Sequence, residues 1–546
     1  KVDRAAAALR DVLPAIQEVS SRPLVLHEVP IRDGTAVTGY IDLVTEKAYA
    51  FRPNAPSDEV ALPESVRERE RQARTQMLEQ LADFDDALLE KLLEDQVPSS
   101  DEIAASFARD LVEDRIVPVF LGSAEHDNGV RRLIAYLVAL VPEPGVTAAR
   151  RGVAAEGPPL AQAIKTLTGG QGGKLTVARI WRGRFNDGDV VNGHRIGGIY
   201  RLMGAAQIKI DHAEAGDVVA LGRLDGVRTG DSIAPGDGAP EPALPRAELA
   251  PATFALAIHA QRRDDDVKLS PALAKLIDED PSLAFEQDAE VNQLVLHGYG
   301  DIHLNIAFER LRNRFKLPVE STRPRVAYKE AIRKPVTQHG RFKRQTGGHG
   351  MFGDVHVEIK PLPRGSGFEF SEHVVGGSVP RNFIPAVEAG VREYLVKGPL
   401  GFQVVDVAVK LFDGSYHQVD SNEMSFKLAA RAAMTEGMPK CAPILLEPIN
   451  HVEISVPASA TSKVNQLVNA RRGQLLGFEA KAEWPGWDVI VANIPAAEMQ
   501  DLVLELRSLT QGVGVFASRF DHLAELTGRI ADHIVQAHAE ATAKAS

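Results

Sequence analysis

The sequence holds one cysteine, Cys441, among 546 residues. A single thiol excludes an intramolecular disulfide framework and any zinc cluster built on cysteines. No apolar run approaches the ~18–20 residues that cross a bilayer, and no signal-peptide pattern opens the chain. We therefore expect a cytoplasmic protein that has no membrane partner.

A phosphate loop is also missing. Its pattern, G-x-x-x-x-G-K-[ST], requires a glycine and a hydroxyl where T-G-G-Q-G-G-K-L has Thr168 and Leu175. The glycines Gly348, Gly350 and Gly353 do spell G-x-G-x-x-G. Dinucleotide binding requires a helix after those glycines, whereas the pattern here predicts a second strand. Both stretches are therefore predicted to be hairpins.

The composition, 44% hydrophobic and 25% charged, is typical of a soluble globular protein, and the length predicts three to five domains. The net charge of −12 is unevenly distributed. Residues 58–115 contain 17 acidic and seven basic residues, whereas residues 323–346 contain eight basic residues and one acid, Glu330. A charge run is usually a solvated face. A basic segment in an acidic protein is nevertheless a candidate for binding nucleic acid.

Residues 341–353, R-F-K-R-Q-T-G-G-H-G-M-F-G, join this basic segment to a glycine-rich turn. The strand that follows places Val355, Val357 and Ile359 on one face by alternation, so a hairpin is predicted. One interpretation is that the glycines only permit positive φ in a tight turn. The other is that a small tip beside Lys343 and Arg344 approaches a phosphate backbone.

A second stretch, residues 413–420, reads D-G-S-Y-H-Q-V-D. We interpret it as another turn between strands, with Tyr416 and His417 near its tip. An exposed histidine in a loop often has no role. Tyrosine beside histidine can, however, stack on bases or donate to phosphate and ribose.

The first 150 residues predict a partial parallel α/β domain. A helix is expected over residues 5–20 and a strand pair at 24–28 and 39–42. Acidic helices are expected over 63–115. The apolar run 116–121 is typical of a buried parallel strand, and a helix is expected over 130–140.

Two short motifs lie where strands of this domain end, which is where parallel sheets bind ligands. The first is K-V-D at the start of the chain, and the second is G-S-A at residues 122–124. Asp3 could accept two hydrogen bonds from a nucleotide base, and Lys1 could pack along the base. The N–H of Ala124 could donate to a base carbonyl. Chance occurrence is the alternative for each triplet.

Short strands without helices over residues 160–233 predict a small β-barrel, and a proline-rich linker follows at 235–251. The order β-α-β-β-α-β occurs over residues 254–320 and again over 451–521, which predicts two ferredoxin-like units. Between them, a helix after Pro380 is predicted to bury one stripe of side chains. None of these folds specifies a function by itself.

A series of motifs then carries a resemblance. In chain order they are K-V-D-R, G-S-A, G-D-I-H-L, R-Q-T-G-G-H-G-M-F-G, P-R-G-S-G-F-E-F, D-G-S-Y-H-Q-V-D-S-N-E-M, L-E-P-I, N-A-R-R-G-Q-L-L-G and L-R-S-L-T-Q-G. This ordered set resembles bacterial translation elongation factor G over essentially the whole chain.

The resemblance implies a multidomain α/β and β protein. Residues 1–150 would be the C-terminal part of a P-loop-type GTPase domain, with the acidic insertion at about 24–115. The remaining parts would be a translation-factor β-barrel (151–240), a ferredoxin-like domain (252–321), a protruding α+β domain (322–447), a second ferredoxin-like domain (448–528) and a C-terminal helical tail (529–546).

The resemblance also implies a site and its ligands. Lys1 and Asp3 would belong to the guanine-specifying N-K-x-D motif, and Ser123 and Ala124 to the S-A motif beside the base of GTP or GDP. The residues implied to bind nucleic acid in the ribosomal decoding region are Lys343, Arg344, Gln345, Gly347, Gly348, His349, Gly350, Tyr416 and His417.

In this family the phosphate loop, the switch regions and the Mg²⁺ ligands precede N-K-x-D. The chain starts without methionine, and we expect that it begins inside a longer protein. It holds no assigned catalytic residue or metal ligand and should not hydrolyse GTP alone. The implied partners of this monomer are the ribosome, through its RNA and stalk proteins, and the tRNA and mRNA.

Three departures from the family pattern indicate a paralogue branch. G-P-L-G-F-Q-V-V-D is one residue short, and His349 and Val513 differ from the commonest forms. The leading hypothesis is GTP-dependent translocation of tRNA and mRNA. The alternatives are a ribosome recycling or ribosome-protection GTPase, and a non-enzymatic ribosome- or RNA-binding protein with a degenerate nucleotide site.

Overall fold

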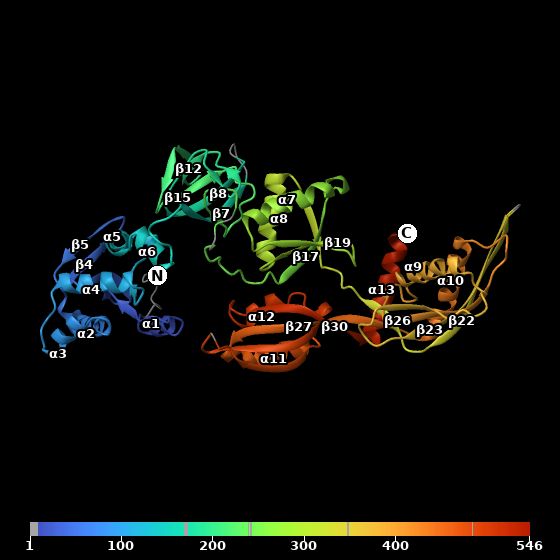
Figure 1. Cartoon of the computed structure of the whole chain (residues 1–546). Helices are drawn as coiled ribbons and strands as arrows, with labels where there is room; N and C mark the ends of the chain where they lie inside the picture. The colour runs from blue at the N-terminus through green and yellow to red at the C-terminus, as the bar shows by residue number, and fades with distance from the viewer. Residues whose placement is uncertain are drawn as a thin grey trace. The chain divides into compact units, whose positions relative to one another are not determined.

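The computed structural model describes residues 9–168, 173–238, 240, 243–346, 349–482 and 484–545. The chain divides into two compact units, drawn from blue to red in Figure 1. One contains residues 1–165 and 169–245, and the other contains residues 166–168 and 246–546.

The first unit begins with helix α1 (Leu9–Gln17), which is shorter than the helix predicted over residues 5–20; residues 1–8 lie outside the described part. Strands β1 (Leu24–Leu26) and β6 (Val117–Val119) pair in parallel, as predicted. The expectation that β6 is fully buried is wrong, since Val117 is 39% exposed. Among the described residues only β1 pairs with β6, so this strand is not enclosed in a wider sheet.

The acidic insertion contains more strand than the sequence indicated. Instead of a strand pair, four strands form an antiparallel sheet: β2 (Glu28–Asp33), β3 (Ala36–Asp42), β4 (Lys47–Arg52) and β5 (Ala55–Val60). The helices that follow are η1 (Glu64–Val66), α2 (Arg67–Ala82), α3 (Asp86–Leu93) and α4 (Ser100–Val112). Leu78, Leu81 and Leu88 are buried in the core that these helices share. A capping box between Ser99 and Glu102 fixes the start of α4.

After β6 come η2 (Ala124–His126), α5 (Val130–Leu140) and α6 (Pro144–Arg150). In the part of the chain that the structure describes, no single helix is long and apolar enough to cross a membrane. The pair α5 and α6 passes that test only jointly, with a bend of 67° between them.

The predicted barrel region contains strands throughout. They are β7 (Leu160–Thr168), β8 (Lys174–Arg182), β9 (Arg184–Asn186), β10 (Val190–Val191), β11 (His194–Arg195), β12 (Ile199–Met203), β13 (Ala206–Ile210), β14 (His212–Glu214), β15 (Val218–Gly222) and β16 (Ser232–Ile233). Six of them form a sheet in the order β13-β12-β15-β8-β7-β16. Because β7 and β8 are neighbours, the glycine-rich stretch between them joins two strands, as the sequence predicted.

In the second unit, a first β-α-β-β-α-β set comprises β17 (Phe254–Ala260), α7 (Asp266–Glu279), β18 (Ala284–Asp288), β19 (Gln293–Gly298), α8 (Asp301–Phe315) and β20 (Val319–Thr322), with η3 (Arg263–Asp265) before α7. The sheet order β18-β19-β17-β20 is that of a ferredoxin-like fold.

The second set comprises β27 (Pro443–Pro457), α11 (Thr461–Ala470), β28 (Gln474–Ala480), β29 (Trp487–Pro495), α12 (Leu502–Leu509) and β30 (Val515–Leu526), with η6 (Ala458–Ala460) and η7 (Ala496–Glu498) before the helices. Strand β27 pairs with both β29 and β30, which gives the same ferredoxin-like order. Helix α13 (Arg529–Ala545) closes the chain.

Between the two sets lies the protruding region. Its elements are β21 (Lys329–Ile332), β22 (Val336–Thr346), β23 (His349–Pro361), β24 (Phe368–Glu372), η4 (Arg381–Phe383), α9 (Ile384–Leu395), β25 (Gln403–Val404), β26 (Val407–Ser415), α10 (Glu423–Gly437) and η5 (Met438–Cys441). Strands β22-β23-β26-β24 form one sheet, and α10 packs on β22 and β23 (Figure 1). The predicted stripe of α9 is buried at Val387 and Val391.

This region has no linker to the second ferredoxin-like set. The first residues of β27 pair with β21, and its later residues pair with β29. Residue 447, which the sequence suggested as a domain edge, therefore lies inside one continuous strand.

Candidate functional site

Strands β22 and β23 form the predicted hairpin. Their antiparallel register runs from Val336 opposite Ile359 to Thr346 opposite His349. Val355, Val357 and Ile359 are fully buried, which confirms the face assigned by alternation. Gly347 and Gly348, between the strands, lie outside the described residues, as do the side chains of Gln345 and His349.

The first interpretation of the glycines, that they permit positive φ in a tight turn, does not hold for the two glycines of β23 that the structure describes. Neither Gly350 nor Gly353 has positive φ. A Cβ on Gly353 would instead lie 2.4 Å from the carbonyl oxygen of Ser425 in α10. Gly340 on β22 is equally confined, since its Cβ would meet the carbonyl oxygen of Ala429 at 2.4 Å. These glycines let the backbone of α10 lie directly against the hairpin.

The stretch with Tyr416 and His417 is not a turn between strands, and that prediction is wrong. It leads from β26 into the first turn of α10. The side chain of Asn422 accepts a hydrogen bond from the N–H of Ser425 at 2.8 Å, and the Ser425 hydroxyl in turn receives the N–H of Asn422. This capping box starts a helix, whereas a turn between strands would be followed by a strand.

The same loop is bonded to the hairpin close to its tip. Phe352 donates its N–H to the carbonyl oxygen of Asp420 at 2.8 Å, and Gly350 donates to the Asp420 carboxylate at 3.1 Å. The Ser421 hydroxyl donates to the carbonyl oxygen of Phe352 at 2.8 Å. Three hydrogen bonds thus hold the loop and the hairpin as one piece, although they are distant in the sequence.

His417 is fixed within this loop while its ring stays exposed. Its N–H donates to the Ser421 hydroxyl at 2.9 Å, and its Nδ1 lies 3.2 Å from the N–H of Asp420. When Nδ1 accepts this bond, the ring proton is on Nε2. No described residue bonds to Nε2, and Tyr416 beside it is 46% exposed. The loop therefore presents the Nε2 edge of an imidazole ring and a phenol to solvent.

The two basic residues of the tip lie on opposite faces of the ribbon. Lys343 is opposite Phe352 and Arg344 is opposite Met351, so alternation sends their side chains to different sides. Both are exposed, and neither forms an ion pair with a described residue. A cationic group is thus available on each face.

The strand-end motif of the first unit is only partly described. Lys1 and Asp3 lie outside the described residues. Ser123 is buried and exchanges two backbone hydrogen bonds with Asn128, at 2.9 and 3.0 Å. Ala124 is exposed, and its N–H donates to no described residue. The N–H of Ala124, on a loop held by the Ser123–Asn128 hydrogen bonds, fits the expected contact with a base carbonyl.

A buried charged cluster, missed from the sequence, holds this loop in place. The carboxylate of Glu28 accepts the N–H of Leu121 at 3.0 Å, one residue before the G-S-A motif. Burial raises the pKa of Glu28 to about 7, although the Leu121 N–H and the Arg132 charge act in the opposite direction. The guanidinium of Arg132 also pairs with the buried Asp42. Only a contact across 93 residues joins Glu28 to this loop, so no local pattern could have revealed it.

His27, the neighbour of Glu28, is also buried. It packs among the rings of Phe107, Phe120 and Tyr136, with centroids 4.2 to 5.0 Å away. Burial, followed by the charge of Arg132, lowers the pKa of His27 to about 4. The imidazole is therefore neutral at physiological pH.

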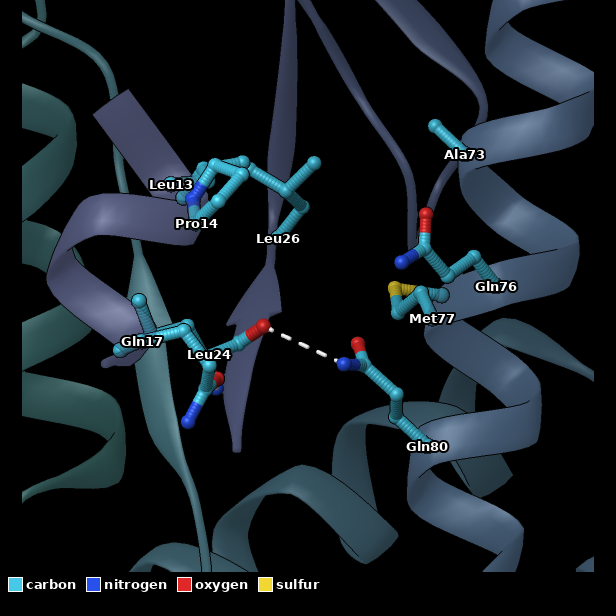
Figure 2. Close-up of a pocket in the computed structure, with 9 residues that line it drawn as sticks. All are labelled: Leu13, Pro14, Gln17, Leu24, Leu26, Ala73, Gln76, Met77 and Gln80. Carbon is cyan, nitrogen blue, oxygen red and sulfur yellow. Dashed lines mark hydrogen bonds between the residues drawn. The ribbon is translucent and has the colours of Figure 1, made fainter. Parts of the chain in front are cut away.

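A separate cavity of about 240 Å³ lies in the first unit between α1, β1 and α2 (Figure 2). Its polar walls are glutamines, and Gln80 donates to the carbonyl oxygen of Leu24 at 3.4 Å. None of the predicted site residues lines it.

The comparisons with known proteins decide the family. The family models described as Elongation factor G domain 2, domain III, domain IV and C-terminus match residues 160–236, 249–323, 324–442 and 444–534. An elongation factor G-like protein from Synechocystis is 52% identical over 536 residues, which is 98% of this chain and 80% of that protein. The chain belongs to the elongation factor G family.

The structural comparison agrees. A crystal structure of a Thermus thermophilus protein matches with a TM-score of 0.77 at 32% identity, covering 97% of this chain and 78% of that one. The family is one of translational GTPases that act on the ribosome in protein biosynthesis. The family that the ordered motifs predicted is thus confirmed, as is the multidomain elongation factor G fold.

Proposed function

We propose that this protein promotes GTP-dependent translocation of tRNA and mRNA on the ribosome, and that the hairpin tip with residues 416–422 engages RNA in the decoding region. The observation that carries the proposal is the hydrogen-bonded union of hairpin and loop around Phe352, Asp420 and Ser421. A translocating element must hold its shape while it contacts RNA. Here a basic ribbon and an exposed tyrosine–histidine pair form one small rigid surface.

The chemistry of this surface suits binding rather than bond cleavage. Lys343 and Arg344 can neutralise phosphates from either face of the ribbon. Tyr416 can stack on a base or donate to ribose, and Nε2 of His417 can donate to a phosphate oxygen. The tip thus acts by shape and charge, and the energy for movement would come from GTP hydrolysis.

The nucleotide would bind at the end of β6. Ala124 would contact the base through its free N–H, and Lys1 and Asp3 would specify guanine. Ser123 would lie beside the base, and the carboxylate of Glu28 would keep the loop in place. Hydrolysis of GTP would supply the energy for the rearrangement.

The deciding experiment uses the full-length protein and the variant His417→Ala. Movement of fluorescent mRNA in pretranslocation ribosomes should slow by at least about tenfold, because one charge-assisted contact contributes roughly 1.5–3 kcal/mol. Ribosome-stimulated GTP hydrolysis should be unchanged. His259→Ala is a matched control, because His259 is also exposed and lies 3.3 Å from a carboxylate, that of Glu320.

The same assay separates the other candidates. Ribosome splitting without mRNA movement would identify a recycling factor. The Synechocystis relative is named only as elongation factor G-like, so its name does not distinguish recycling from translocation. Absence of ribosome-stimulated GTP hydrolysis would identify a non-enzymatic binding protein. A loss of hydrolysis in His417→Ala equal to the loss of movement would contradict the role given to the tip.

A further inference from the structure

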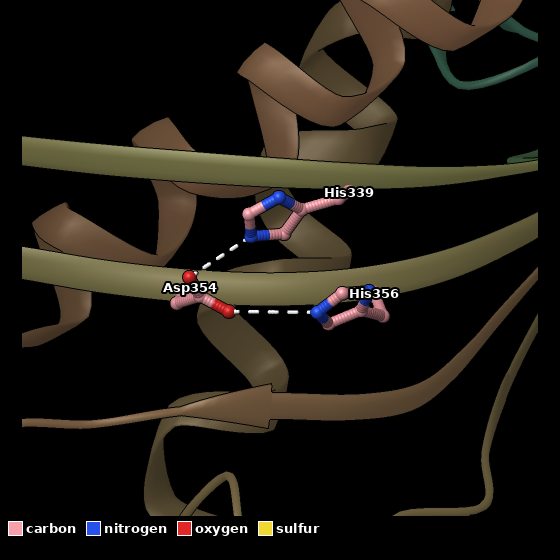
Figure 3. Close-up of side chains that lie close together, drawn as sticks. All are labelled: His339, Asp354 and His356. Carbon is pink, nitrogen blue, oxygen red and sulfur yellow. Dashed lines mark hydrogen bonds and ion pairs between the residues drawn. The ribbon is translucent and has the colours of Figure 1, made fainter.

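Two histidines and an aspartate converge on the sheet face opposite α10, on the hairpin but away from its tip (Figure 3). Nε2 of His339 lies 2.9 Å from one oxygen of Asp354, and Nε2 of His356 lies 3.8 Å from the other. The three potential ligand atoms all lie within 4.8 Å of one another. This group was not recognised from the sequence, where no metal ligand was assigned.

The strand register brings these residues together. His339 on β22 lies directly opposite His356 on β23, and Asp354 precedes His356 by two residues, so all three share a face. The strand register is therefore needed to predict that these three side chains lie together. Without it, His339 is too far along the chain from the other two for any local signal.

The backbone that carries the group is firmly held. Strand β23 is central, with β22 on one side and β26 on the other. Val355 and Val357, which alternate with Asp354 and His356, are fully buried beneath them. The ligand positions therefore cannot drift apart without opening the core, which makes a preformed site.

The side chains already have the orientation that a metal requires. The two imidazole rings are stacked, with centroids 4.4 Å apart and planes 14° from parallel, and both direct Nε2 at the carboxylate. An ion bound at about 2.0–2.2 Å from each ligand needs only small rotations of these side chains. Asp354 is largely buried, whereas the histidines are partly exposed, so an ion can enter from solvent.

Charges around the group permit a cation. Nε of Arg341 lies 3.8 Å from Asp354, but its guanidinium carbon lies over the Phe352 ring, 5.3 Å from the centroid. Asp413 on β26 is the register partner of His356 and adds a negative charge on the other side.

We propose that His339, Asp354 and His356 bind one divalent transition-metal ion, with Zn²⁺ the best match. Two imidazole nitrogens and one carboxylate oxygen suit Zn²⁺ and its neighbours, whereas Mg²⁺ and Ca²⁺ prefer oxygen ligands alone. Three protein ligands leave a position for water or another oxygen donor. The ion would link β22 to β23 and stabilise the hairpin. This metal binding does not depend on the proposed translocation.

The test is calorimetric titration of the metal-free full-length protein with Zn²⁺ at neutral pH. We expect saturable binding of one ion per chain that weakens at least about tenfold in both His339→Gln and His356→Gln, because each removes a direct ligand. These partly exposed histidines can be replaced without emptying the core. His417→Gln is the matched control, because His417 also lies beside a carboxylate but has no second histidine.

A second readout keeps the result independent of affinity alone. Co²⁺ in the same site should give visible d–d absorption that is lost in both variants and retained in His417→Gln. Zn²⁺ should also slow hydrogen exchange in β22 and β23. No saturable Zn²⁺ binding, or binding that survives either His339→Gln or His356→Gln, would overturn the three-ligand site.

Discussion

The tip of the hairpin and the loop that carries Ser123 and Ala124 are both expected to bind RNA or nucleotide, but they are held in different ways. Hydrogen bonds to Asp420 and Ser421 and close glycine packing against α10 hold the tip. A buried carboxylate, Glu28, with a raised pKa holds the loop. The tip should therefore be sensitive to added side-chain volume, and the loop should be sensitive to pH.

Gly353→Ala should have the largest effect. Its Cβ would lie 2.4 Å from the backbone of Ser425, and helix backbone cannot move aside as a side chain can. Overpacking of a well-ordered core costs about 1–3 kcal/mol, and a backbone clash belongs at the top of that range. Hydrogen exchange in β22 and β23 should accelerate by roughly 100-fold, since about 1.4 kcal/mol is a factor of ten.

Gly477→Ala is the control for this prediction. Gly477 also lies in a strand, β28, but an added Cβ would meet nothing within 4 Å. Its exchange should stay close to that of the native protein. Equal effects of the two substitutions would show that strand glycines matter only through backbone freedom and would remove the proposed role of close packing.

Glu28→Gln tests the pH sensitivity of the other loop. The folded-state pKa of Glu28 is raised from 4.5 to about 7, so its contribution to stability falls as pH rises through that range. The pKa of His27 is lowered from 6.5 to about 4, so its contribution falls as pH drops through that range. Between pH 4.5 and 6.5 the two slopes oppose each other.

Glutamine keeps the acceptor for Leu121 but cannot titrate. The variant should therefore lose on the order of 2–3 kcal/mol of unfolding free energy between pH 6.5 and 4, because only the His27 slope remains. The native protein should change much less over the same range. Urea unfolding midpoints, measured by pulsed hydrogen exchange at β6, give this pH dependence for the variant and for the native protein. Identical pH profiles would mean that Glu28 is not the compensating group.

Sequence patterns predicted those features that depend on neighbours along the chain. Alternation located the hairpin and its buried face at Val355 and Val357, and helix spacing located α5 and the stripe of α9. The ordered motifs then supplied the family. The same patterns could not show that Gly353 faces a helix backbone, because its partner, Ser425, lies far along the chain.

The remaining errors have the same origin. Our prediction of a turn between strands at His417 is wrong because Asn422 and Ser425 carry a capping signal, which predicts a helix start. Glu28 and the His339–Asp354–His356 group depend on pairing across many residues. The local sequence predicts which side chains share a face of a strand or helix. The pairing register of the strands determines which side chains of different strands are in contact.

Replacing Lys343 and Arg344 by serine should weaken RNA binding without unfolding the tip, because both are exposed and free of described ion pairs. If each neutralises one phosphate, the log–log slope of ribosome affinity against salt should become shallower by about 1–2. The control replaces Lys275 and Lys397, which are exposed outside the tip. An unchanged slope in the tip variant would exclude direct phosphate contact by these residues.

Ser421→Ala should have the smallest effect. Its hydroxyl receives the N–H of His417 and donates to the carbonyl oxygen of Phe352, so its loss frees the loop from the hairpin at one point. A hydrogen bond of this kind contributes about 1 kcal/mol, which predicts roughly fivefold faster exchange at His417.

The rest of the molecule should be unaffected by Ser421→Ala. Thr435→Ala is the control, because among the described residues the Thr435 hydroxyl bonds only to the Arg431 carbonyl oxygen of its own helix, at 2.8 Å. If Ser421→Ala slowed mRNA movement as much as His417→Ala, positioning of the histidine would account for the role of the loop. If movement were unchanged while exchange increased, the ring would act without a fixed orientation, and the rigid-tip proposal would fail.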